Sequence, residues 1–322
     1  MTTTSTPPSR TPPPPPARGP RPNYALRRAV AAGVALLVLI LFVLLVRAVL
    51  GGGSGDGAAP PTAVEESPIT TEAPTTTTTA VVGFPRHNDL SQPPTFALRE
   101  PPLRTVSEAD PLTVWVLGDS TAQALGQLFE NQVKDVPGIQ ARTIYKNSTG
   151  LTRQDFYDWP AALPSYLAEG APDVVVLSMG DNDAQALQPQ GSTTYVDVDS
   201  PQWLTEYSRR LGGFVDQLTA AGSRVYVVGQ PVMRSETFNA RIAVVDSAYR
   251  ALAAADPDIT YVDAKALLAD DAGAYTDALP GAGGAAVTVR NSDGIHLSVE
   301  GARWLARVVA RQVGSDYGIQ AP

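Results

Sequence analysis

The chain has 322 residues, a net charge of −8 and no cysteine. The absence of cysteine excludes disulfide bridges and thiolate metal ligands, and an acidic chain without a basic patch does not have the composition of a nucleic-acid-binding protein. Thr- and Pro-rich sequence surrounds one apolar run in the first third, and regular apolar patterns begin only near residue 111. We therefore expect one globular domain, residues 111–322, behind an N-terminal region of a different kind.

Residues 29–50 predict a transmembrane helix. The stretch from residue 29 to residue 46 holds 18 residues without a charge, and Arg47 can extend its side chain toward the lipid headgroups, which lengthens the span to residue 50. At about 1.5 Å per residue, such a helix crosses a hydrocarbon core of about 30 Å. Arginines at positions 18, 21, 27 and 28 precede it. The positive-inside rule therefore places residues 1–28, a disordered segment, in the cytoplasm and the remainder outside the membrane.

A cleaved signal peptide is the alternative for this run. Its apolar region would be about 7–15 residues long and would end in a cleavage site of the A-x-A type. The run is longer than that, and the sequence RAVLGGGSG at its end is a poor cleavage site. A retained signal-anchor helix fits the sequence better.

Residues 51–110 are rich in Thr, Pro and Gly and predict a disordered stalk. Sequence of this kind buries too little apolar surface to offset the entropy lost on ordering. A flexible coil of this length spans roughly 40–45 Å, which would hold the following domain above the bilayer, at the depth of the cell wall. The chain is thus expected in the cell membrane as a single-pass protein with residues 111–322 on the outside.

Residues 111–322 alternate short apolar runs with helical patterns. Runs typical of strands cover residues 114–117, 141–145, 174–178, 225–229 and 259–262, and helical patterns follow at 122–133, 161–169, 203–221, 239–255 and 299–313. The third run, VVVLS, is apolar on both faces, as a central parallel strand should be. This alternation predicts an α/β fold in which a five-stranded parallel sheet is the middle layer of an α/β/α sandwich.

The ends of the first three predicted strands carry polar and glycine-rich sequence, and ligands bind at this edge of such sheets. The sequence GDS at 118–120 leads into a helix, whose first N–H groups favour a developing negative charge near Ser120; a serine that only caps the helix is the alternative. A loop with Gly150 follows the second strand. GDND at 180–183 follows the third, where the Asn182 amide can donate to an oxyanion or only hold an Asx turn.

One histidine falls in the expected domain. It ends the sequence DGIH at 293–296, just before the last helical pattern, whereas the other histidine, His87, falls in the stalk. An acid three residues before a histidine can turn back to its Nδ1 atom and fix the orientation of the ring. If the domain performs histidine-assisted chemistry, His296 is its base and Asp293 the acid that orients it; a lone surface histidine is the alternative.

Together these four segments resemble the sequence blocks of the SGNH (GDSL-like) hydrolases. GDS at 118–120 resembles the first block, Gly150 the second, GDND the third, of the form G-x-N-D, and DGIH the last, of the form D-x-x-H. The resemblance covers about residues 112–313, and the segment 148–160 resembles an uncharacterised bacterial branch of that superfamily. Thr121 follows GDS where the GDSL signature has Leu, which leaves the subfamily open. The resemblance implies a flavodoxin-like fold, Ser-His-Asp catalysis, and ester or O-acyl substrates.

Carried over position by position, the resemblance implies that Ser120 attacks an ester carbonyl while His296 takes its proton and Asp293 orients His296. The N–H groups of Ser120 and Gly150 and the side-chain amide of Asn182 would hold the oxyanion. The neighbouring acids at positions 119 and 183 are interpreted as structural. No cofactor is expected, and no metal, because the domain offers one histidine, no cysteine and no EF-hand spacing.

Three functions remain open at this stage. The first is an extracytoplasmic esterase that hydrolyses short acyl esters, above all O-acetyl esters of envelope glycans, because loops such as 184–202 and 282–290 are small and polar. The second is an O-acyltransferase that passes the acyl group to a wall sugar with the same triad. The third is a non-catalytic glycan-binding domain. The expected partners are an acylated glycan or another small ester, and the membrane through the N-terminal helix.

Overall fold

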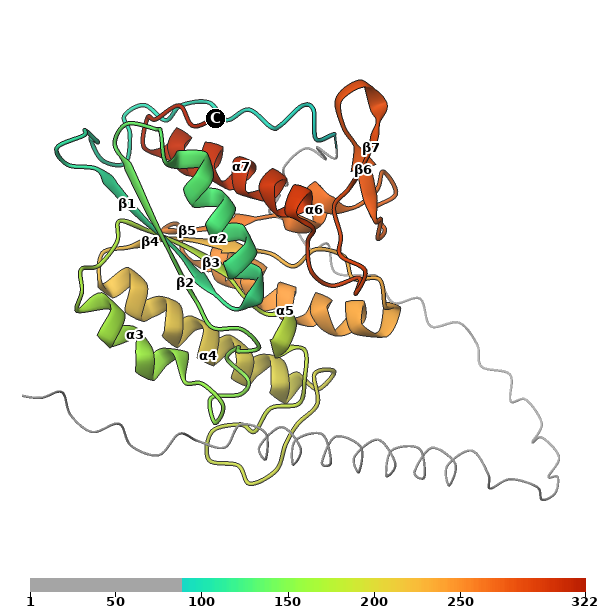
Figure 1. Ribbon diagram of the computed structural model, residues 1–322. Coiled ribbons are helices and arrows are strands. Elements are labelled where there is room, and N and C mark those ends of the chain that lie inside the picture. Colours follow the sequence, from blue (N-terminus) through green and yellow to red (C-terminus); the bar gives the residue numbers. More distant parts are fainter. Residues whose placement is uncertain (1–88) are drawn as a thin grey trace, which may run out of the picture. The chain divides into compact units, whose positions relative to one another are not determined.

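The computed structural model describes residues 89–322 (Figure 1). The predicted transmembrane helix at 29–50 and the predicted stalk up to residue 88 lie outside these residues. Within the described part of the chain, no helix is both long and apolar enough to cross a membrane.

A five-stranded sheet forms the centre of the domain. Its strands are β1 (Leu112–Gly118), β2 (Ile139–Tyr145), β3 (Val174–Ser178), β4 (Arg224–Val228) and β5 (Ile259–Val262). They lie in the order β2-β1-β3-β4-β5, and every neighbouring pair is parallel. The winding therefore reverses between β1 and β3, and the carboxyl ends of these two strands flank the crevice in which ligands of such sheets bind.

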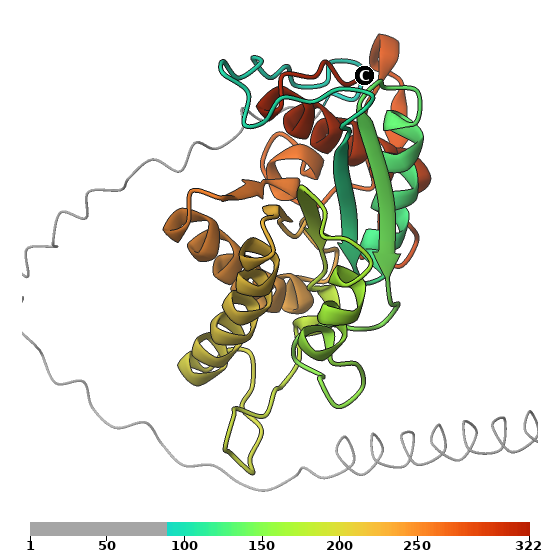
Figure 2. The same ribbon diagram turned by 90° about the vertical axis from the view of Figure 1, so that its left-hand side faces the viewer.

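Helices cover both faces of the sheet, which confirms the predicted α/β sandwich (Figures 1 and 2). One face packs against α2 (Ser120–Val133), α6 (Ala264–Leu268) and α7 (Val299–Asp316), and the other against α3 (Trp159–Leu167), α4 (Pro201–Ala220) and α5 (Glu236–Ala255). Alternate residues of each strand serve the two cores: Val114 and Val116 face the first, Trp115 and Leu117 the second. All five residues of β3 are buried, as expected of a central strand.

The helices begin where a polar side chain can cap them. Each cap accepts a hydrogen bond from an N–H group of the first turn, and the caps of α2 to α7 are Asp119, Asp158, Ser200, Ser235, Asp263 and Ser298. Four of the five predicted helices start two or three residues earlier than the apolar pattern indicates. Apolar periodicity is a weak guide to the first turn of a helix, because the residues there are selected for capping and not for burial.

A short helix and a β-hairpin were not predicted. The helix α6 has only five residues, and the strands β6 (Ala278–Pro280) and β7 (Ala286–Thr288) pair as an antiparallel hairpin outside the main sheet. The hairpin belongs to the long connection between α6 and α7, whose Gly- and Ala-rich sequence shows no period.

Residues 89–106 form a strap along α7, although the sequence analysis assigns them to the stalk. Side chains of the strap, among them Phe96, Leu103 and Val106, pack against the core between α2 and α7. Its backbone donates to the end of α7 and the residues near it, from Arg99 N to Ser315 O at 2.8 Å and from Leu103 N to Asp316 O at 3.0 Å. Figure 1 shows the strap running over α7 on its way to β1. The apolar side chains are scattered among prolines, so no sequence period reveals this packing.

Candidate active site

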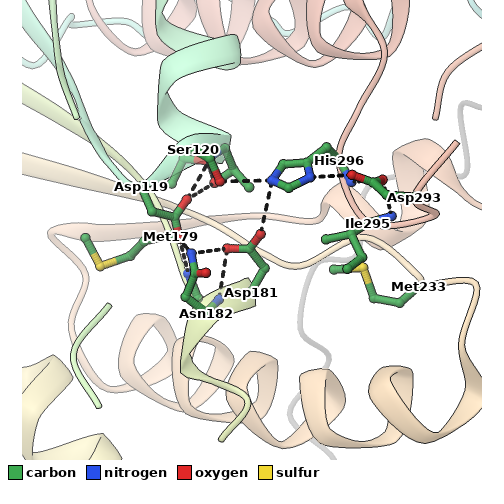
Figure 3. Close-up of polar contacts among 12 residues, drawn as sticks. Asp119, Ser120, Met179, Asp181, Asn182, Met233, Asp293, Ile295 and His296 are labelled. Carbon is green, nitrogen blue, oxygen red and sulfur yellow. Dashed lines mark hydrogen bonds and ion pairs between the residues drawn. The ribbon is translucent and has the colours of Figure 1, made fainter. Parts of the chain in front are cut away.

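The four sequence segments singled out above meet at the carboxyl edge of the sheet. Ser120 is the first residue of α2, directly after β1, and GDND follows β3, with residues 181–183 in a single turn of 3-10 helix, η1. The close approach of β1 and β3 depends on Gly118, because a Cβ atom there would lie 1.9 Å from the Ser178 carbonyl oxygen. The loop with His296 reaches the same edge from the opposite end of the sequence (Figure 3).

Ser120, His296 and Asp293 form a continuous chain of hydrogen bonds. Ser120 Oγ lies 2.9 Å from His296 Nε2, and His296 Nδ1 lies 2.7 Å from Asp293 Oδ2. Asp293 Oδ1 accepts from the backbone N–H groups of Ile295 and His296. Partial burial raises the pKa of Asp293, but these hydrogen bonds outweigh it and keep the pKa below its ordinary value. The carboxyl is thus an anion at neutral pH and suited to orient an imidazole.

Arg234, which the sequence analysis missed, fixes the loop that carries Asp293 and His296. Its backbone N–H donates to Gly294 O at 3.1 Å, and its Nη1 donates to Ser292 O at 2.8 Å. Its Nη2 donates to Asp277 Oδ1 at 2.7 Å, which ties the loop to the residues before β6. Arg234 lies between β4 and α5, far from the loop in sequence, and nothing in its own sequence context marks it.

Asp119 is a buried carboxylate that joins two of the segments. It caps α2 through the N–H and hydroxyl of Thr121, both at 2.8 Å. Its second oxygen accepts from Gly180 N and from Asn182 Nδ2, both at 3.2 Å. The carboxylate therefore holds the turn after β3 against the residue that starts α2.

Asp183 plays the same part between the loops after β2 and β3. It is fully buried and accepts from Thr152 N at 2.8 Å, Thr152 Oγ1 at 3.0 Å and Tyr207 OH at 2.9 Å. Burial raises its pKa to about 6 despite these donors. The carboxyl also explains Gly150, because a Cβ atom on that residue would lie 2.2 Å from Asp183 Oδ1.

Asn182 directs its amide at two carboxyl groups. Nδ2 donates to Asp119 Oδ2 at 3.2 Å and to Asp181 Oδ1 at 3.1 Å. The structure thus brings Ser120, Gly150 and Asn182 to one edge of the sheet, and the role of these three residues as oxyanion donors stays a prediction.

Asp181 is a second residue that the sequence analysis overlooked. Its Oδ2 atom lies 3.7 Å from His296 Nε2, and its Oδ1 atom accepts from the backbone N–H of Asn182 at 3.0 Å. Burial, followed by the nearby Asp119, raises the pKa of Asp181 to about 9. Its place in the G-x-N-D block, directly after a strand end, is the signal that could have drawn attention to it.

A small apolar cavity of about 40 Å³ opens beside Ser120 and His296. It lies between α2, the end of β4 and α7. Its walls are mainly aliphatic and include Ala124, Leu125, Val228, Leu297, Ala302 and Leu305. Among residues 89–322, no group of three or more His, Asp or Glu side chains is placed to hold a metal ion.

A family model described as a protein of unknown function (DUF459) matches residues 113–312, which is most of the described chain. The chain belongs to this family. No curated protein matches it. The family match includes all four segments of the candidate site and both edge strands of the main sheet, β2 and β5.

Several solved structures are similar to the chain. An acetyl xylan esterase is 17% identical, with a TM-score of 0.44, over 61% of this chain and 97% of the other. A GDSL-like lipase from Bacteroides thetaiotaomicron is 14% identical, with a TM-score of 0.44, over 63% and 87%. The C-terminal catalytic domain of peptidoglycan O-acetyltransferase A from Streptococcus pneumoniae is 17% identical, with a TM-score of 0.42, over 66% and 97%. Similarity at this level assigns no activity to the chain.

Proposed function

We propose that this protein is a serine esterase that hydrolyses short acyl esters, with Ser120 as nucleophile, His296 as general base and Asp293 as the acid that orients the base. The observation that carries the proposal is the unbroken chain of hydrogen bonds from Ser120 Oγ through His296 to Asp293. It ends at a serine on a helix N-terminus, beside a small apolar cavity.

The proposed reaction follows from the hydrogen bonds that join Ser120, His296 and Asp293. His296 Nε2 removes the proton from Ser120 Oγ as the oxygen attacks the ester carbonyl carbon, and Asp293 stabilises the imidazolium that forms. When the tetrahedral intermediate collapses, His296 gives this proton to the departing alkoxide, and the acyl group stays on Ser120. Water then repeats the sequence: it loses a proton to His296, attacks the acyl carbon and releases the acid and Ser120.

The negative charge on the carbonyl oxygen needs donors in both halves of the reaction. The proposal assigns this role to the N–H groups of Ser120 and Gly150 and to the amide of Asn182. Ser120 lies in the first turn of α2, where N–H groups have no acceptor within the helix. Because Asn182 Nδ2 already donates to two carboxyl groups, the oxyanion has to take over one of these hydrogen bonds. Loss of a single donor of this kind typically lowers kcat by about 10²–10³.

The cavity favours a short acyl group. About 10–15 Å³ of such space holds one water-sized group, so a cavity of about 40 Å³ accepts an acetyl group or one only slightly longer. Long-chain substrates need an extended apolar groove, because each buried CH₂ group contributes about 0.8 kcal/mol. Buried side chains of α7, among them Leu305, line the cavity and limit its size.

The proposed substrate is an O-acetylated glycan of the cell envelope. The support for this part is the sequence: the apolar run at 29–50 and the arginines before it place the domain outside the membrane, and the Thr- and Pro-rich stalk gives it reach into the wall. The proposed protein is thus a membrane-anchored, extracytoplasmic enzyme with its N-terminus in the cytoplasm.

The decisive experiment compares the full-length protein with its Ser120→Ala variant. We expect wild type to hydrolyse p-nitrophenyl acetate and butyrate faster than the laurate ester, and to bind a fluorophosphonate probe at Ser120 alone. The variant should retain its fold, seen by circular dichroism, and lose both activities. Labelling at another residue, or a rate above a tenth of wild type, would contradict the assignment of the nucleophile.

The substrate is tested separately with O-acetylated wall material. We expect release of free acetate in water. An added wall sugar should not accept the acetyl group to form a new sugar ester. A preference for chains of 12 carbons or more would contradict the proposed substrate. An acyl product that forms only with a sugar acceptor would replace hydrolysis by acyl transfer with the same triad.

A further inference from the structure

The proposed mechanism leaves one buried carboxyl group of the site unused. Asp181 follows β3 and is 7% exposed, yet its Oδ2 atom lies 3.7 Å from His296 Nε2. Figure 3 shows Ser120 and Asp181 directed at the same ring nitrogen, while Asp293 occupies the far side of the ring. Asp181 therefore lies beside the atom through which every proton of the reaction passes.

The distance between the two atoms is informative. At 3.7 Å it is too long for a direct hydrogen bond, which extends to about 3.2 Å. A third oxygen atom, beside the line that joins them, could lie about 2.8 Å from both atoms and accept a hydrogen bond from each. In acylation, the oxygen that must approach His296 Nε2 is that of the leaving alcohol, because it takes the proton from this nitrogen. The position next to both atoms therefore suits the leaving-group oxygen.

The surroundings of Asp181 favour its neutral form. The ionisable groups that face it are Asp119 from the start of α2, Asp183 from the same turn of η1, and His296 from the loop before α7. Two of the three are acids, and burial withholds water from the carboxyl. These effects, burial first, raise the pKa of Asp181 to about 9. A carboxylic acid that stays neutral at pH 7 can donate a hydrogen bond in catalysis.

We propose that Asp181 is a catalytic residue that donates a hydrogen bond from its neutral carboxyl group to the leaving-group oxygen during acylation. This inference rests on the proposed esterase function and adds a donor that the triad and the oxyanion hole do not supply. The proton of Asp181 stays on its carboxyl group. His296 transfers the proton that the alkoxide takes up, so the reaction remains balanced as described above.

The test varies the leaving group. p-Nitrophenolate is stable as an anion and needs little help to depart, whereas ethoxide needs a donor. In the full-length protein we expect Asp181→Ala to lower kcat/KM for ethyl acetate, which reports acylation, by about 10²- to 10³-fold and to change kcat/KM for p-nitrophenyl acetate less than threefold. Asp181→Asn keeps a neutral donor and should retain most of the ethyl acetate activity at pH 7.

The pH profile supplies a second readout. With ethyl acetate, the wild-type rate should fall above about pH 9 as Asp181 ionises and loses its proton, and the Asp181→Asn rate should not show this fall. Equal losses on both esters in Asp181→Ala would overturn the inference and leave the esterase intact. If Asp181→Asn is as impaired as Asp181→Ala at pH 7, the residue acts as an anion and the inference is wrong. If wild type hydrolyses neither ester, the proposed function fails and the inference with it.

Discussion

At the residue scale, buried acids set the geometry of the site. Asp119 and Asp183 each hold a loop in place through backbone N–H groups, and the groups that donate to them are neutral amides and hydroxyls. The two carboxyl groups differ from a surface ion pair, because hydrogen bonds from neutral groups, in a site shielded from water, take the place of a cation. Asp183 is the clearer case, since its pKa is raised to about 6.

The raised pKa of Asp183 predicts a pH-dependent stability. The folded-state pKa lies above the unfolded value of about 3.9, so the carboxyl stabilises the fold fully below pH 3.9 and this contribution is lost as the pH rises through about 6. A difference of about two pKa units corresponds to about 3 kcal/mol. We expect the free energy of unfolding of wild type, minus that of Asp183→Asn, to fall by about this amount between pH 4 and pH 7.5. Urea unfolding of both proteins at the two pH values measures it, and a difference that does not change with pH would contradict the burial effect.

At the element scale, the loop from Asn291 to His296 owes its shape to contacts with other parts of the chain. Arg234 donates to two of its carbonyl groups, and Gly294 has a φ of +74°, which favours glycine. A Cβ atom on Gly294 would also lie 2.6 Å from the Cβ atom of Arg234. The imidazole is therefore positioned by contacts from the connection between β4 and α5 and from the residues before β6, and not by the loop alone.

Replacement of Arg234 should impair catalysis more than stability. Arg234→Met keeps the aliphatic stem and removes the guanidinium that holds Ser292 and Asp277. We expect kcat for p-nitrophenyl acetate to fall about 10-fold, because a small displacement of His296 weakens its contact with Ser120. Arg241→Met is the matched control, since Arg241 is similarly exposed and pairs with Asp197, away from the loop. Equal activities of the two variants would show that Arg234 does not position the loop.

The same comparison shows what could be predicted from the sequence. Ser120 and the pair Asp293–His296 could be predicted because each stands in a short sequence motif, GDS or DGIH. Asp181 stands in such a motif too, but its approach to His296, like the contact of Arg234 with Ser292, joins residues more than 50 positions apart and becomes visible only in the fold. β1 and β3 were found almost to their ends because their β-branched runs are buried on both faces. Helix starts were placed late because capping residues, not apolar periodicity, determine where a first turn begins.

At the scale of the whole molecule, the strap at 89–106 extends the folded domain beyond the part with regular patterns. Arg104 binds Asp173 through two nitrogens, at 2.9 and 3.0 Å, and this pair joins the strap to the start of β3. Partial burial raises the pKa of Asp173, but the hydrogen bonds from Arg104 and Thr113 prevail and keep it below its ordinary value. The strap is thus anchored at the amino edge of the sheet, opposite the candidate site.

A domain without the strap should be less stable but should keep a reactive Ser120. Removal of residues 89–110 takes away the apolar contacts of Phe96, Leu103 and Val106, and we expect a loss of about 3 kcal/mol. For a domain of this size that lowers Tm by about 6–12 °C. Fragments 89–322 and 111–322, compared by thermal melting, should differ by this amount, while both bind a fluorophosphonate probe at Ser120. Equal Tm values would show that the strap adds nothing to the fold.

The packing of α7 also determines when the chain can fold. Among residues 89–322, this helix fills the space between α2 and the strap that precedes β1. The core on that side of the sheet therefore joins residues that are about 200 positions apart in the sequence, and such long-range contacts form slowly. A chain that stops before residue 299 exposes the apolar side of α2, with Leu125, Phe129 and Val133, and becomes prone to aggregation. Residues 299–316 have to be synthesised before this side of the domain can close.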